Sequence, residues 1–136
     1  MLTSRLFRLA GAATLVATLV LGGCKNSTGP LAPFQPQINN IADNFEFQAT
    51  GVSNVTWTYT YTWSNSGTTA SVNQSTTIAA GTAVVTVLDK NGTQVYTQSL
   101  SANGTFATSA GVAGTWTVRV LFTNYSGTGN FRVQKA

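Results

Sequence analysis

A strict alternation of side-chain types constrains this chain more than any other feature of its sequence. Over the nine residues Val55 to Trp63, β-branched or aromatic residues occupy every odd position and threonine occupies every even position. Successive side chains of a β-strand point to opposite faces, so this period of two predicts a strand with one buried and one solvated face. No stretch after residue 40 has the period of an amphipathic helix. The sequence therefore predicts an all-β fold.

Further segments of strand character are separated by residues that favour turns. They cover residues 44–48, 69–78, 83–88, 93–100, 105–109, 115–123 and 130–134. Turns are predicted at 65–67, 89–92, 111–114 and 126–129, where glycine and asparagine gather. Segment 83–88 is nearly all apolar, which predicts a central strand buried on both faces. About eight short strands predict a single antiparallel β-sandwich with a jelly-roll-like or an immunoglobulin-like path.

Three segments in the second half carry a family resemblance, namely Asp89–Thr93, Gly111–Val120 and Ser126–Val133. Their turn glycines, and the apolar residues that alternate after them, resemble the bacterial pre-peptidase C-terminal domain. The likeness spans residues 45–133 and implies a small jelly-roll-like sandwich, which in that family usually accompanies a secreted hydrolase. Calcium-binding members carry an acidic residue at the start of the strand that corresponds to 83–88. This chain has none there, so the resemblance implies no calcium site.

The beginning of the chain has the three zones of a secretory signal peptide. Arg5 and Arg8 supply positive charge, residues 9–21 are apolar or small without any charge, and Gly22 and Gly23 supply small residues at the expected cleavage site. The apolar run is shorter than the about 20 residues that a membrane-spanning helix needs. A plain N-terminal membrane helix is the alternative interpretation.

The only cysteine, Cys24, ends this leader. The sequence Leu21-Gly22-Gly23-Cys24 is similar at every position to the lipobox of bacterial lipoproteins. The resemblance implies that Cys24 receives a diacylglycerol thioether, that residues 1–23 are removed, and that the new amino terminus is acylated, for example with palmitate. Two or more acyl chains hold a protein stably at a membrane. Because enteric lipoproteins of the inner membrane carry an acidic residue after this cysteine, Lys25 implies the outer membrane.

Residues 24–40 contain all three prolines of the chain and have no hydrophobic period. This composition predicts a semi-extended tether, so we expect a signal peptide at 1–23, a tether at 24–40 and a sandwich domain at 41–136. The alternative is that Phe34 and Ile38, near the end of the tether, pack onto the domain. Residues 24–136 carry five basic and three acidic side chains without a basic cluster, which indicates no nucleic-acid partner. With Cys24 committed to lipid, no disulfide is expected.

The chain contains no histidine, which excludes the Ser-His-Asp and Cys-His catalytic triads. We expect Asp89 to form an Asx turn, and Asp43 or Glu46 to face Arg119 or Arg132. A glycosidase-like pair of Asp89 with one of the other two acids is the alternative. The sequence predicts no enzyme, no metal site and no cofactor other than the covalent lipid.

Trp57, Tyr59, Tyr61 and Trp63 form an aromatic row along one predicted strand. The first interpretation is that this row is the buried face of the strand. The alternative is a platform on which sugar rings stack, because two hydroxyls and two indole N–H groups need partners if buried. The threonine row of residues 56–62 has two interpretations. It is a solvated face, or it is an ordered hydroxyl array that binds ice or crystalline polysaccharide.

These observations predict a lipid-anchored, non-catalytic protein of the bacterial cell envelope. The membrane is its first partner, and a polysaccharide or another envelope protein is the second. Protein partners would pair with exposed strand edges, which low charge and high β-propensity favour. The alternatives are a carbohydrate-binding module that uses the aromatic row, and an accessory domain for a secreted hydrolase.

Overall fold

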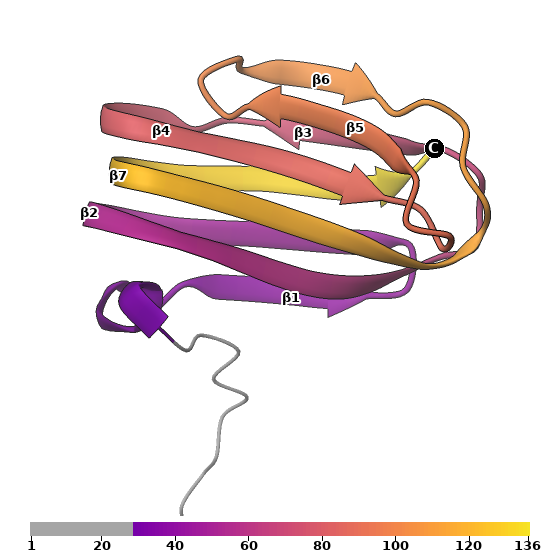
Figure 1. Cartoon of the computed structure of the whole chain (residues 1–136), viewed down its shortest axis with the longest axis horizontal. Coiled ribbons are helices and arrows are strands. Elements are labelled where there is room, and N and C mark those ends of the chain that lie inside the picture. Colours follow the sequence, from indigo (N-terminus) through magenta and orange to yellow (C-terminus); the bar gives the residue numbers. More distant parts are fainter. Residues whose placement is uncertain (1–28) are drawn as a thin grey trace, which may run out of the picture.

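The computed structural model describes residues 29–136, which form an antiparallel β-sandwich with one short 3-10 helix (Figure 1). The elements in chain order are η1 (Gly29–Phe34), β1 (Gln37–Ile41), β2 (Asn44–Asn65), β3 (Ala70–Gln74), β4 (Thr77–Leu88), β5 (Gln94–Ser99), β6 (Gly104–Ala107) and β7 (Gly114–Lys135). All strand pairs are antiparallel. The predicted all-β sandwich is therefore confirmed.

Two strands of 22 residues, β2 and β7, run through both layers of the sandwich. Residues 44–49 of β2 pair with 129–134 of β7, whereas residues 57–65 pair with 114–122. Residues 44–49 of β2 and 129–134 of β7 belong to layer one, together with β1, β3 and β6. Residues 57–65 of β2 and 114–122 of β7 belong to layer two, together with β5 and most of β4. A single continuous sheet thus folds over itself.

The strands cross between the layers at one end of the molecule, where the pairing register shifts. We call this the bend end and define it by residues 50–56, 78–82 and 123–128. Figure 1 shows η1 near this end, with the C-terminus and the β4–β5 hairpin at the opposite end, here the turn end. Asn124 and Gly127 have positive φ angles of 46° and 144°, which let β7 change direction while its pairing continues.

The bends explain how the observed strands differ from the predicted ones. The predicted strands 44–48 and 55–63 are the two halves of β2, and 115–123 and 130–134 are the two halves of β7. The predicted turn at residues 126–129 is therefore a bend inside β7. β4 lies centrally between β5 and β7 as expected, but only one of its faces is buried. Its outer side chains Val84, Thr86 and Leu88 are partly exposed, so the expectation of burial on both faces is wrong.

The N-terminal part of the described chain belongs to the sandwich. β1 pairs with residues 44–48 of β2, and the Leu31 side chain of η1 is fully buried. The structure thus places residues 29–40 in the folded unit and not in a tether, with Phe34 and Ile38 packed against the core as the alternative interpretation expected. The fixed φ of proline fits a 3-10 helix as well as an extended spacer, so proline content does not distinguish the two.

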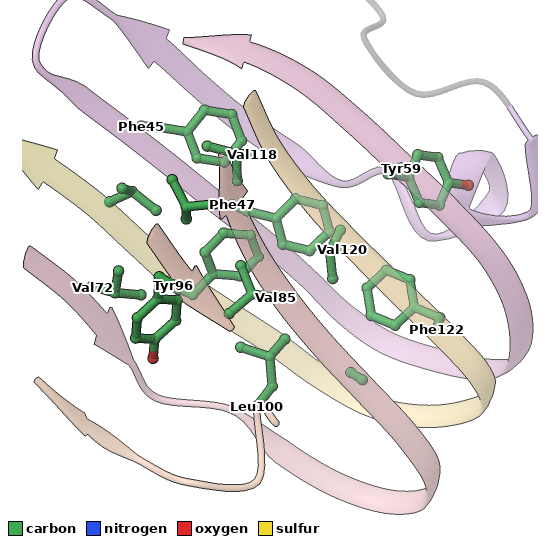
Figure 2. Packing of buried hydrophobic residues seen from close by; sticks show 14 of the residues in the cluster. Phe45, Phe47, Tyr59, Val72, Val85, Tyr96, Leu100, Val118, Val120 and Phe122 are labelled. Carbon is green, nitrogen blue, oxygen red and sulfur yellow. The ribbon is translucent and has the colours of Figure 1, made fainter. Parts of the chain in front are cut away.

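Aromatic side chains from both layers form the centre of the core (Figure 2). The Phe47 ring lies 5.2 Å from Phe131 within layer one and 6.1 Å from Phe122 in layer two. Val85, Val118 and other aliphatic side chains of layer two complete this centre. The buried residues are those that period two assigns to the inner faces of the strands.

Candidate functional site

The aromatic row of β2 points mainly into the sandwich. Tyr59 and Trp63 are 6% and 1% exposed, and Tyr61 is partly buried between the layers. Trp57, at the bend end of the row, is 50% exposed. The four rings therefore do not form one open surface for stacking sugars, and of the four only Trp57 presents much of its ring to solvent.

Helix η1 covers the side of the sandwich where the aromatic row would otherwise meet solvent. The backbone N–H of Leu31 donates a hydrogen bond of 2.8 Å to the phenolic oxygen of Tyr59. Gly29 lies against Trp57, since a Cβ atom built on it would be 3.3 Å from Trp57 Cε2. Burial raises the pKa of Tyr59, and the hydrogen bond from Leu31 acts in the opposite direction. The segment that enters the domain is thus fixed on the row.

Two polar atoms of the row find no hydrogen-bond partner among residues 29–136, namely the Tyr61 hydroxyl and Trp63 Nε1. Burial, followed by the neighbouring Tyr59, raises the pKa of Tyr61 far above its ordinary value. The Trp63 ring meets Trp116 edge-on at 5.9 Å and 89°. Packing rather than hydrogen bonding therefore holds this part of the row in place.

The outer face of layer one carries a shallow hollow that is rich in side-chain amides. It is lined by residues of β1, β2 and β7 that include Gln37, Asn39, Glu46, Gln48, Asn130 and Arg132. Arg132 Nε lies 2.8 Å from Glu46 Oε1, which confirms that one of the two early acids faces Arg119 or Arg132. Amide, carboxylate and guanidinium groups donate and accept hydrogen bonds, so this hollow suits a polar ligand.

The outer face of layer two presents the threonine row. Thr58, Thr60 and Thr62 are exposed, and they lie opposite Leu121, Arg119 and Thr117 of β7. The row is therefore a solvated face, as the first interpretation expected. Leucine and arginine interrupt the hydroxyl groups across the strands, so the face is not a uniform hydroxyl array.

The carboxylates of Asp43 and Asp89 are both bound by turns. Asp89 accepts hydrogen bonds from the backbone N–H groups of Asn91, Thr93 and Val112, so the predicted Asx turn is confirmed. The bond from Val112 is the first cause of a lowered Asp89 pKa. Asp43 accepts from the backbone N–H and the hydroxyl of Ser66, which lower its pKa in the same way.

The lipobox residues Leu21, Gly22, Gly23 and Cys24 lie outside the described residues, as does the whole predicted leader. Within residues 29–136, no helix is long and apolar enough to cross a membrane. The same residues contain no group of three His, Cys, Asp or Glu side chains placed to hold a metal ion.

Comparisons with known proteins add little to this description. No protein-family model matches the sequence, and no curated protein matches it. Among solved structures, a chain from "Structure of infectious bursal disease virus Gt strain" is similar at a TM-score of 0.29 and 14% sequence identity. The match covers 74% of this chain and 32% of that chain. A similarity of this size carries no functional argument, and the resemblance to the pre-peptidase C-terminal domain stays a prediction.

Proposed function

We propose that this protein is a lipid-anchored component of the bacterial cell envelope, held at the outer membrane, whose β-sandwich binds or supports another envelope component without catalysing a reaction. The sequence Leu21-Gly22-Gly23-Cys24 at the end of an apolar leader carries this proposal. Lipid on Cys24 supplies the membrane attachment, and two or more acyl chains make it stable.

The fold supports this arrangement because it begins very soon after the cysteine. Gly29 is the first residue of η1 and stands five positions beyond Cys24. Five residues reach at most about 18 Å when fully extended. The sandwich would therefore sit directly on the membrane rather than at the end of a long spacer. Its two polar outer faces remain available to partners.

The anchor is tested by mass spectrometry of the mature N-terminus together with membrane fractionation. We expect a first residue Cys24 that carries a diacylglycerol and an N-acyl chain, and a protein that remains with the outer membrane. The variant Cys24→Ser keeps the side-chain size but removes the thiol, so it should accumulate unprocessed. An unmodified Cys24, or a C24S variant that is processed and fractionated as before, would contradict the proposal.

Polysaccharide binding is a second candidate, favoured by the amide-rich hollow on layer one. Gln48 and Asn130 flank the Glu46–Arg132 ion pair, which gives donors and acceptors for sugar hydroxyls on neighbouring strands. A glycan array probed with residues 24–136 carrying Cys24→Ser tests this. Binding that is lost in Gln48→Ala but kept in Thr60→Ala, a matched change on the other outer face, supports the hollow as the site. Equal binding in both variants argues against it.

A further inference from the structure

We infer that the bend end of the sandwich rests on the membrane surface, with the Trp57 ring in the lipid headgroup region. The inference rests on the lipid anchor proposed above and adds an orientation to it. Three observations carry it: the point at which the chain enters the domain, the absence of charged side chains from η1 and the three bend segments, and the exposure of Trp57.

The described chain begins beside Trp57. Gly29 packs against the indole, with an ideal Cβ position 3.3 Å from Trp57 Cε2, and Leu31 is bound to Tyr59 by its backbone N–H. The entry point is therefore fixed on the sandwich. An acylated Cys24 lies five residues earlier in the sequence, within about 18 Å of chain. The interfacial region of a bilayer is about 5–8 Å deep on each side. Trp57 is thus within reach of that region.

The distribution of charged side chains favours contact of the bend end with lipid. Neither η1 nor the three segments of the bend end contain Lys, Arg, Asp or Glu. The turn end holds Asp43, Asp89, Lys90 and Lys135, in or next to the connections between strands. Removing an ionised group from water is costly, whereas serine, threonine and asparagine exchange hydrogen bonds with headgroups. The uncharged end is therefore the end that approaches a membrane at the lower free energy.

Trp57 differs from the other two tryptophans of the chain. Trp63 and Trp116 are 1% and 0% exposed, whereas half of the Trp57 surface is exposed. An indole ring has an apolar body and one N–H donor, and tryptophan is enriched where membranes meet water for this reason. At the turn end the most exposed large apolar residue is Ile41, at 58%, followed by Val112, at 45%. Ile41 therefore provides a matched position at which to place a reporter.

Fluorescence quenching by lipid tests the orientation. The full, lipidated protein is placed in vesicles of phosphatidylethanolamine and phosphatidylglycerol, with brominated phosphatidylcholine as the quencher. We expect the transfer of Trp57 from water to the headgroup region to blue-shift its emission, and the brominated lipid to quench that component. That component should be lost in Trp57→Phe, since Trp63 and Trp116 are buried. In the double variant Trp57→Phe/Ile41→Trp, the new tryptophan at the turn end should emit without quenching.

The outcomes separate the orientation from the anchor. Trp57 emission that is not quenched, in protein whose mass proves lipidation and which floats with the vesicles, overturns the orientation and leaves the anchor intact. Equal quenching of W57F/I41W and wild type also overturns it, because the domain would then have no preferred end. An unmodified Cys24 overturns both proposals. Quenching that persists at high salt agrees with contact through an uncharged surface.

Discussion

The backbone N–H of Leu31 lies 2.8 Å from the phenolic oxygen of Tyr59 and donates a hydrogen bond to it. This bond joins η1 to the half of β2 that belongs to layer two, and the Leu31 side chain is fully buried beside it. The segment that leads into the domain is therefore part of the fold. Any group attached shortly before Gly29 is consequently held near the bend end of the sandwich.

The attachment of η1 should contribute measurably to stability. We expect Leu31→Ala to lower the free energy of unfolding by about 2–3 kcal/mol, the low end for a buried leucine, because η1 lies at the rim of the core. Tyr59→Phe removes the acceptor and should cost about 1 kcal/mol. Urea unfolding measures both, with Ala32→Ser on the exposed side of η1 as the control. An L31A variant as stable as A32S would mean that η1 is not docked in solution.

The two ends of the aromatic row should respond differently to truncation. Trp63 is buried against Trp116, so Trp63→Ala should lower the free energy of unfolding by about 3–5 kcal/mol. Trp57 is half exposed, and Trp57→Ala should cost less than about 1 kcal/mol. Chemical denaturation of the two variants measures both losses of unfolding free energy. Similar losses in both would show that Trp57 is as deeply packed as Trp63.

The sequence predicted the inner faces of the strands well, because period two depends only on local side-chain order. Trp116, Val118, Val120 and Phe122 are all buried, as their alternation with Thr117, Arg119 and Leu121 requires. The continuity of β2 and β7 was not predictable in this way. A glycine with positive φ, such as Gly127, fits a turn between two strands as well as a bend within one continuous strand. Only the pairing register with the partner strand distinguishes the turn from the bend.

The candidate site was less accessible to prediction than the fold. Glu46 and Arg132 meet because β2 and β7 pair in one register, and the sequence restricted the partner of an early acid only to Arg119 or Arg132. The hollow around them has no motif, since its amides come from three strands. Helix η1 and the burial of Leu31 were not predicted, and packing of Phe34 and Ile38 was only the alternative, because a proline-rich segment with one buried leucine resembles a tether in composition.

Acid should weaken the turn end through Asp89. Hydrogen bonds from backbone N–H groups lower the Asp89 pKa below its ordinary value of 3.8. A group whose pKa is lower in the folded state stabilises the fold above its unfolded pKa, and this contribution is lost as the pH falls through the folded pKa. We therefore expect the urea concentration at the unfolding midpoint to decrease when the pH is lowered below 3.8. Asp89→Asn should reduce stability at neutral pH but much less in strong acid.

The control for Asp89 is Glu46→Gln, which removes a carboxylate from an exposed ion pair with Arg132. Exposed ion pairs contribute about 0–1 kcal/mol, so E46Q should change the neutral-pH midpoint less than D89N does. The readout is the urea midpoint of wild type and both variants across the acid range. A D89N difference that stays constant with pH would show that the carboxylate charge plays no part in holding the turn.

The bends themselves can be tested with glycines that differ in their surroundings. A Cβ atom on Gly81 would collide with the backbone oxygen of Asn124, and one on Gly127 would collide with that of Thr77. Both oxygens belong to the partner strand of the β4–β7 pair, so relief of the collision must displace paired backbone. Gly51 also has a positive φ, of 63°, but no atom lies within 4 Å of its Cβ position.

We therefore expect Gly51→Ala to cost about 1–2 kcal/mol, the strain of a left-handed conformation alone. Gly81→Ala and Gly127→Ala should each cost more than about 3 kcal/mol, because backbone strain and a collision add together. Thermal and urea unfolding of the three variants measure these differences. Equal losses at Gly51 and Gly127 would mean that β4 and β7 do not cross closely at the bend. Because G51A keeps the bend end in place, lipid should still quench Trp57 in that variant as it does in the wild type.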